Sequence, residues 1–159
     1  MIEIPLTQGQ VALIDDDDFD LVSKYKWYAL LNIHSQSFYA VTNIIKPDGK
    51  RTSLYMHRLI IGAKKGQQVD HIHHRTLDNR KSELRLCTNT QNQHNRGKYA
   101  NNSSGFKGVC LDKRRKKWKA QIQSNCKYKF LGHYDTPELA HAAYSRAAAE
   151  LHGEFARAE

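Results

Sequence analysis

The sequence predicts an α+β protein in two parts, a mixed N-terminal part at residues 1–97 and a C-terminal part at residues 105–159. Three observations lead to this prediction. Short β-like runs fill the first part and end in a strand, loop, strand and helix pattern. In the second part, alternating apolar and polar residues precede an alanine-rich helical pattern, which predicts a three-stranded antiparallel sheet packed on one helix. Residues 98–104, rich in Asn, Ser and Gly, are expected to link the parts.

Composition and charge narrow the classes of partner. The 159-residue chain has a net charge of +9 and 40% hydrophobic residues, which favours a globular protein that binds polyanions. Residues 98–159 hold 12 Lys and Arg against 6 Asp and Glu. No apolar run approaches the roughly 20 residues of a membrane span, and the first residues lack the basic and apolar segments of a signal peptide. We expect a cytoplasmic protein of a bacterium or phage-infected cell, with no membrane contact and no obligate protein partner.

The cysteines carry no sign of a metal or disulfide framework. Cys87, Cys110 and Cys126 are odd in number, widely spaced and without a CxxC pair. We expect reduced thiols that serve as small apolar residues.

The first residues predict a hairpin and an acidic turn. Residues 2–4 and 11–14 are β-like runs on either side of Gly9. Four aspartates follow at residues 15–18. Consecutive carboxylates cannot all face one ion, whereas Asp-rich turns commonly cap helices. We interpret the run as a capping or solvated turn before a helix that begins at Phe19.

Three more strands and a short helix are predicted next. The strands are expected at residues 27–31, 38–41 and 53–56, with a Pro-Asp-Gly turn at 47–49. A helix is expected at residues 57–61, ending near Gly62. Most of these aromatic and aliphatic side chains should lie in the core. Two roles remain open for His57: it could orient other residues, or it could contact phosphate together with Arg58.

Residues 69–96 carry the strongest functional signal, because they are rich in Asp, His and Asn, which are poor helix and strand formers. Residues 67–72 and 84–87 are predicted strands joined by a polar loop. Thr88 is expected to cap a helix that contains Asn92. A hairpin laid on a helix can bring the end of its first strand opposite one helix face. Asp70 and Asn92 could then share a hard divalent cation.

This segment resembles the HNH nucleases, specifically their homing-endonuclease-like branch with the ββα-metal fold. The matching stretches are VDHI at 69–72, LDNR at 77–80, LR at 84–85 and QNQHNR at 91–96. IPLTQG at 4–9 and YMHRLI at 55–60 are also similar. The resemblance implies Asp70 and Asn92 as metal ligands, His71 as the general base and one Mg²⁺ or Mn²⁺ ion as the cofactor.

The chemistry of these residue types agrees with those roles. Oxygen ligands and water suit Mg²⁺ or Mn²⁺. A neutral imidazole, with an ordinary pKa near 6.5, can take a proton from water at physiological pH. The ion would polarise the scissile phosphate and stabilise the leaving 3′ oxygen. The resemblance therefore implies hydrolysis to 5′-phosphate and 3′-hydroxyl ends by an enzyme of a phage or mobile element.

Glu83 departs from the family pattern. It stands where the family has an asparagine that ties the loop together and helps to orient the histidine. An ionised carboxylate accepts hydrogen bonds but cannot donate them as an amide does. Glu83 could instead draw the proton onto His71, and Asn79 could take over the loop-structuring role.

Two loop histidines, His73 and His74, also depart from the family's usual turn. Together with His71 and His94 they leave a zinc site open as an alternative. We prefer to interpret them as exposed imidazoles that contact phosphate.

The second part predicts a basic sheet and one helix. A β-meander is expected to begin within residues 104–111 and to continue with strands at 118–123 and 127–132. Residues 112–117, between the first two strands, contain five positive charges. Thr136 is the expected N-cap and Pro137 the first residue of an alanine-rich helix, which should end at Gly153.

These elements resemble the APETALA2/ethylene-response-factor DNA-binding domain over about residues 105–159. The matching stretches are FKGV at 106–109, WKAQI at 118–122, LGHYDT at 131–136 and GEFA at 153–156. That domain places one face of its sheet in the major groove, so the resemblance implies double-stranded DNA as the partner. The residues expected on this face are Lys107, Lys113, Arg114, Arg115, Lys116, Lys117, Lys119, Gln121, Gln123, Lys127 and Lys129.

The combined expectation is a metal-dependent endonuclease that nicks double-stranded DNA. A second class remains open: a catalytically impaired, sequence-specific DNA-binding regulator, which metal-dependent turnover would distinguish. A third, RNA binding or cleavage, fits less well because the sheet suits the major groove of B-form DNA and not the deep, narrow groove of A-form RNA.

Overall fold

The computed structural model describes residues 1–33, 35–95, 97–98, 102–124 and 127–157. It divides into two compact units, Met1–Thr88 and Asn89–Glu159. Small antiparallel sheets and a few helices make up the described chain, which confirms the α+β prediction. Among the helices of the described ranges, none is long and apolar enough to span a membrane.

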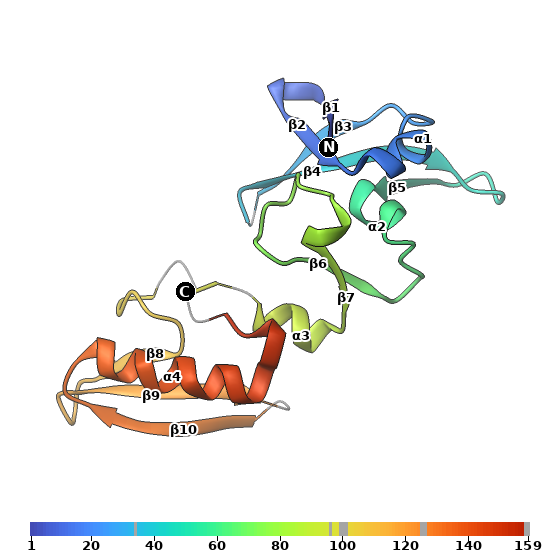
Figure 1. Cartoon of the computed structure of the whole chain (residues 1–159). Helices are drawn as coiled ribbons and strands as arrows, with labels where there is room; N and C mark the ends of the chain where they lie inside the picture. The colour runs from blue at the N-terminus through green and yellow to red at the C-terminus, as the bar shows by residue number, and fades with distance from the viewer. Residues whose placement is uncertain (34, 96, 99–101, 125–126, 158–159) are drawn as a thin grey trace. The chain divides into compact units, whose positions relative to one another are not determined.

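Three small antiparallel sheets form most of the first unit (Figure 1). Its strands are β1 (Ile2–Pro5), β2 (Val11–Ile14), β3 (Tyr28–Asn32), β4 (Ser37–Ile45), β5 (Arg51–Tyr55), β6 (Gln68–His71) and β7 (Leu84–Cys87). Its helices are α1 (Phe19–Val22) and α2 (Met56–Ile60), with 3-10 helices at Thr7–Gly9, Asp16–Asp18 and Lys81–Glu83. The strands pair as β1–β2, β3–β4–β5 and β6–β7. All the strands predicted for this part are present, and β4 is longer than predicted because its first half pairs with β3 and its second half with β5.

One apolar core joins these sheets and helices. Ile14 of β2, Val22 of α1, Ala40 of β4, Met56 of α2 and Leu84 of β7 belong to a single buried cluster. Removing such side chains from water is the main source of stabilisation in a domain of this size. Because Leu84 belongs to the cluster, the β6–β7 hairpin is fastened to the core of the unit.

The loop between β6 and β7 is held against β2. Leu13 donates its N–H to the carbonyl of Leu77 at 2.9 Å and accepts the N–H of Asn79 at 2.8 Å. A parallel bridge therefore forms between Leu13 and Asp78. These bonds satisfy backbone groups that would otherwise need water, and they fix the path of a loop without regular structure.

The acidic run at residues 15–18 also anchors this loop, which corrects its interpretation as a helix cap. α1 begins at Phe19 as predicted, but in this described stretch no aspartate side chain caps it. Instead, Asp15 Oδ2 accepts the N–H of Lys81 at 2.8 Å, and Asp18 Oδ1 pairs with Lys81 Nζ at 2.9 Å. The carboxylates bind a tertiary partner that the local sequence could not reveal.

The second unit contains the predicted three-stranded antiparallel sheet and its helix (Figure 1). Its elements are α3 (Asn89–His94), β8 (Val109–Asp112), β9 (Lys117–Ser124), β10 (Lys127–Tyr134), α4 (Pro137–His152) and a 3-10 helix at Gly153–Phe155. β9 is the central strand. Ile122 of β9 packs against Tyr144, Ala147 and Ala148 of α4. The small alanine side chains let the helix lie close to the sheet.

Both ends of α4 confirm their predictions. Thr136 Oγ1 accepts the N–H of Leu139 at 3.3 Å, and Pro137 occupies the first turn. At the other end, Gly153 has a φ of 54°, which glycine adopts at little cost.

The predicted linker is only partly described. Residues 99–101 lie outside the described ranges, whereas Asn102 Oδ1 accepts the N–H groups of Ser104 and Gly105 at 3.0 and 2.9 Å. The compact units divide after Thr88, and the domain boundary near residue 97 stays a prediction. Cys87 and Cys110 carry free thiols, as expected, and Cys126 lies outside the described residues.

Candidate functional site

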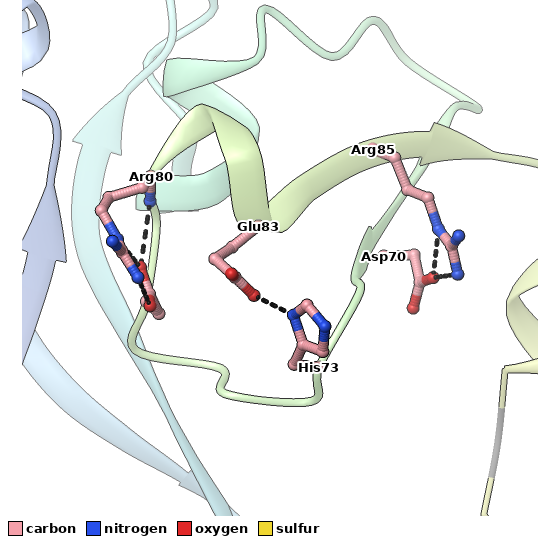
Figure 2. Close-up of polar contacts among 6 residues, drawn as sticks. Asp70, His73, Arg80, Glu83 and Arg85 are labelled. Carbon is pink, nitrogen blue, oxygen red and sulfur yellow. Dashed lines mark hydrogen bonds and ion pairs between the residues drawn. The ribbon is translucent and has the colours of Figure 1, made fainter. Parts of the chain in front are cut away.

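Asp70 and His71 stand at the end of β6, paired with β7. The register places Asp70 opposite Arg85 and His71 opposite Leu84. Arg85 donates from Nε and Nη2 to Oδ2 of Asp70 at 2.8 and 2.7 Å (Figure 2). The two side chains are only 5% and 13% exposed. A charge-assisted pair in this setting fixes the orientation of the Asp70 carboxylate.

His71 lies among aromatic rings from two other elements. Its ring centroid is 5.1 Å from that of His57 on α2 and 6.1 Å from that of Tyr39 on β4. Burial lowers the pKa of His71 below its ordinary value, because desolvation disfavours the imidazolium form. A side-chain hydrogen bond with Asn79 and the charge of Asp70 act in the opposite direction on this pKa. The balance keeps the ring neutral at physiological pH, the form that can accept a proton.

His57 and Arg58 make contacts within the unit. The His57 ring contacts Tyr39, Tyr55 and His71, and burial lowers the pKa of His57 to about 3. Arg58 donates to the carbonyls of Gln67 at 2.7 Å and Lys64 at 2.9 Å. These contacts support an orienting role for His57, and they show that Arg58 fastens the segment that leads into β6.

The two residues predicted to structure the loop lie in different surroundings. Asn79 is fully buried, its Nδ2 donates to the carbonyl of Leu77 at 3.0 Å, and its side chain lies close enough to His71 to raise the pKa of that ring. Glu83 places Oε2 at 2.7 Å from His73 Nδ1 (Figure 2). The residue found in contact with the His71 ring is thus Asn79, while the Glu83 carboxylate faces a different imidazole.

The metal ligands predicted from the sequence are both oxygen donors, but they lie in different units. Asp70 is in the first unit, and Asn92 lies half-buried on α3 in the second. Their sharing of one ion therefore stays a prediction. Within the described ranges, no cluster of three or more His, Cys, Asp or Glu side chains could hold a metal ion, so the zinc alternative gains no support. A carboxylate and an amide oxygen do fit Mg²⁺ or Mn²⁺, since such ions keep several waters and take phosphate oxygens.

The strand register decides which side chains of the second sheet share a face. It places Lys119 opposite His133, Gln121 opposite Phe130 and Gln123 opposite Tyr128. Directly opposed residues of an antiparallel pair point to the same side. Ala120 and Ile122 turn the other way, into the clusters that pack on α4. We call the side with Lys119, Gln121, Gln123, Tyr128, Phe130 and His133 the outer face.

Lys127 and Lys129 do not share the outer face, so their predicted placement beside Lys119 and Gln121 is wrong. They pair with Ser124 and Ile122 and therefore belong to the α4 side, where both are exposed on an edge strand. Tyr128 and Phe130 occupy the outer positions of β10 instead, and they are 69% and 56% exposed. Alternation in a strand allows either set to face outward, and the pairing with β9 decides between them.

Lys107 is half-buried, and its ammonium group donates to the carbonyl of His94 at 2.5 Å. Its contact with DNA stays a prediction. Burial and the nearby Arg157 charge lower the pKa of Lys107 to about 8. The side chain borders a hollow of about 300 Å³ lined by parts of α3, β8, β9 and α4.

The basic turn between β8 and β9 is exposed and ordered. Asp112 Oδ1 accepts the N–H groups of Arg114 and Arg115, each at 3.1 Å, and its Oδ2 lies 3.1 Å from His133 Nε2. These bonds lower the pKa of Asp112. Lys113, Arg114, Arg115 and Lys116 are all exposed, and Lys117 pairs with Asp135 at 2.9 Å. The turn thus presents four of its predicted cations to solvent.

Four residues that build these sites escaped the sequence analysis. The partner of Asp70, Arg85, lies directly across the hairpin, so a register for the predicted strands would have found it. No local signal could have found Tyr39, which comes from a distant strand. For Tyr128 and Phe130 the alternation was visible, but its direction depends on the pairing of β10 with β9.

Known proteins share both regions of the chain. The AP2 domain family matches residues 104–154. Over 152 residues the chain is 33% identical to an uncharacterized HNH endonuclease of Acanthamoeba polyphaga mimivirus, and the match covers 94% of this chain and 74% of that protein. Protein 3.8 of Escherichia phage T7 is 33% identical over 93 residues, which cover 58% of this chain and 76% of the phage protein.

Proposed function

The chain belongs to the HNH endonuclease family and contains an AP2 domain, and on this premise we propose that it is a metal-dependent enzyme that nicks double-stranded DNA. The observation that carries the proposal is the buried His71 beside Asp70 at the end of β6, where burial lowers the pKa of the imidazole. A neutral imidazole next to a carboxylate is the pairing that metal-assisted hydrolysis of a phosphodiester needs.

The metal would be held by Asp70 and Asn92 through a carboxylate and an amide oxygen, the donors that Mg²⁺ and Mn²⁺ prefer. When bound, the ion supplies electrostatic stabilisation of the scissile phosphate and of the leaving 3′ oxygen. Arg85 holds the Asp70 carboxylate in a fixed orientation through two hydrogen bonds to Oδ2. A ligand placed in advance loses less conformational entropy when the ion binds.

His71 would take the proton from the water that attacks phosphorus. Burial keeps its pKa low, so the ring begins each turnover neutral. The neighbouring Asn79 side chain and the ring contacts with Tyr39 and His57 limit its rotation. Once the ring is protonated, the charge of Asp70 stabilises the imidazolium.

The AP2 domain would hold the DNA. Its outer face offers Lys119 and two glutamines, and the turn beside it offers four exposed cations, Lys113, Arg114, Arg115 and Lys116. Side chains of these types bind phosphates and the edges of bases in the major groove.

The test is conversion of supercoiled plasmid to the nicked form by the intact protein, with Mg²⁺ or Mn²⁺ and with EDTA. We expect metal-dependent nicking that His71→Ala abolishes, while binding of the same DNA in a gel shift is nearly unchanged. Lys24→Ala, which changes an exposed side chain of the first unit, is the control and should keep most of the activity.

Each other outcome has a definite meaning. An active His71→Ala variant would remove this histidine from the mechanism. No conversion of plasmids that carry the bound site, with binding intact, would leave a DNA-binding regulator as the function. Cleavage that survives EDTA would contradict the metal requirement.

A further inference from the structure

Two large aromatic rings lie exposed on the outer face of the AP2-domain sheet. Tyr128 is 69% exposed and Phe130 is 56% exposed, and both lie on the edge strand β10. Exposed apolar side chains that cluster on one surface commonly mark a binding site. Both rings lie on the same face as Lys119, so an anionic partner fits this surface better than an apolar one.

Each exposed ring stands next to a glutamine. The register pairs Gln121 with Phe130 and Gln123 with Tyr128, and directly opposed side chains have Cβ atoms about 4.5–5.5 Å apart. Gln123 and Tyr128 are exposed and Gln121 is half-buried, so a partner can reach both pairs. The outer face therefore repeats one unit twice: a carboxamide beside an aromatic ring.

In the major groove, a carboxamide beside an aromatic ring can contact both bases of one base pair. A glutamine carboxamide can bind adenine through N6 and N7 at once, and an apolar side chain contacts the C5-methyl group of thymine. One A·T pair presents both features. Arginine, which commonly binds guanine through O6 and N7, is absent from the sequences of β8, β9 and β10. Lys119, at the other end of the face, can bind phosphate or guanine.

The carboxylate of Asp112, near this face, does not oppose DNA binding. Asp112 is neighbour to Lys117 in the register, and its oxygens accept from the turn and from His133. Its charge is thereby balanced within the basic turn. The glutamine and aromatic end of the face holds no acidic residue.

We propose that the Gln121–Phe130 and Gln123–Tyr128 pairs read A·T base pairs, so that the protein prefers sites with at least two A·T pairs under this end of the sheet. The inference rests on the proposed DNA binding of the AP2 domain and adds its base preference. The carboxamides would recognise adenine, and the rings would recognise the methyl groups of thymine.

The test begins with selection of the preferred duplex from a randomised library by the intact protein in EDTA, which prevents cleavage. Affinity is then compared between this duplex and two altered forms. Deoxyuridine in place of thymidine removes only the methyl group, and 7-deazaadenine removes only N7. We expect about a threefold loss of affinity per critical methyl group and about a tenfold loss for N7.

The variants assign each loss to its side chain. Phe130→Ala and Tyr128→Ala should bind more weakly and no longer distinguish thymidine from deoxyuridine, whereas Phe130→Leu should retain part of the discrimination. Gln121→Ala and Gln123→Ala should lose the response to 7-deazaadenine. Lys127→Ala and Lys129→Ala, on the α4 side of the same strand, are the matched controls and should retain both responses. Because the two rings are exposed, their removal should leave the fold intact.

The outcomes separate this inference from the proposed function. Selection of G·C-rich sites, or unchanged discrimination by the aromatic variants, would overturn the A·T preference while DNA binding stood. Absence of salt-dependent binding to any duplex would overturn the proposed function itself.

Discussion

Two histidines of the first unit are kept neutral by the same surroundings. His57 and His71 contact each other at 5.1 Å, and Tyr39 contacts both. Burial is the largest cause of the lowered pKa of each ring. A base that is unprotonated at the start of each turnover suits hydrolysis, but a buried neutral histidine also makes the fold sensitive to acid.

This sensitivity gives a prediction for pH. The pKa of His57 is about 3 when folded and near 6.5 when unfolded, so the unfolded chain binds more protons between these values. The free energy of unfolding should therefore be fully retained above about pH 6.5 and fall at lower pH, by at most about 1.4 kcal/mol per pH unit for this group. His57→Phe should flatten that slope. Urea unfolding at about pH 7 and pH 5, followed by Trp27 fluorescence in a Trp118→Phe background, measures it.

An exposed histidine is the control for this experiment. His73→Gln, at a site 65% exposed, should keep the slope of the parent protein. Equal slopes for His57→Phe and the parent would show that His57 does not account for the acid sensitivity.

A second prediction concerns the residue that departs from the family pattern. Glu83 contacts His73, whereas Asn79 is buried beside His71. Glu83→Asn should therefore leave the nicking rate within about threefold of the parent, because the contact that it removes is to His73, which is 65% exposed, and not to His71. Asn79→Ala should reduce the rate by about 5- to 30-fold, because loss of one orienting polar contact costs on the order of 1–2 kcal/mol. Single-turnover nicking rates compare the two, and a large drop for Glu83→Asn alone would reverse the assignment.

Among the elements, the segment at residues 73–83, whose only regular structure is the 3-10 helix at Lys81–Glu83, shows how a loop is fixed in place. β2 supplies backbone partners at Leu13, and the acidic run supplies Asp15 and Asp18 to Lys81. The loop ends at Leu84, which is buried in the core. The backbone of Asn79 is therefore anchored to Leu13, and the residues that follow it are anchored through Lys81. These anchors keep the Asn79 side chain beside His71.

Gly108, directly before β8, lies close to Tyr144 of α4. Gly108 has a φ of 71°, and a Cβ atom there would collide with the Tyr144 ring and lie 2.7 Å from the carbonyl oxygen of Gln121. Gly108→Ala should destabilise the second unit by about 2 kcal/mol or more, from strain and overpacking together. Urea unfolding followed by Trp118 fluorescence, in a Trp27→Phe background, measures the change in stability.

Gly105 separates the two causes. It has a similar φ of 79° but nothing within 4 Å of an added Cβ, so Gly105→Ala should show only the smaller cost of the positive φ. Equal destabilisation in the two variants would mean that the collision with Tyr144 adds nothing.

At the scale of the whole molecule, charged side chains have different roles in the two units. In the first unit, Asp15 and Asp18 of the acidic run bind Lys81, whereas Asp16 and Asp17 are exposed. The second unit leaves the turn residues Lys113, Arg114, Arg115 and Lys116 in solvent. If these four cations meet phosphates, the affinity for DNA must depend on salt through counterion release.

Replacing all four by glutamine should therefore reduce the slope of log affinity against log salt by up to about 3.6, at about 0.9 for each phosphate that is no longer neutralised. Fluorescence anisotropy of a labelled duplex between about 50 and 200 mM salt measures the slope. The matched control replaces four exposed lysines of the first unit, Lys24, Lys26, Lys46 and Lys50, and changes the net charge equally. The same slope in both variants would show that net charge, and not the turn, governs binding.

The sequence by itself determined the elements and the kinds of chemistry. Strand alternation, the Thr136-Pro137 helix start and the polar segment around Asp70 and His71 are local patterns, and local patterns survive without knowledge of the fold. The tertiary structure decided everything that depends on pairing. It paired Asp70 with Arg85 and placed Tyr39 and His57 around His71. It paired Asp15 and Asp18 with Lys81. It also turned Tyr128 and Phe130 to the outer face in place of Lys127 and Lys129. The physical reason is that register and long-range burial are fixed by partners far away in the chain, and alternation is equally consistent with either face until a partner strand selects one.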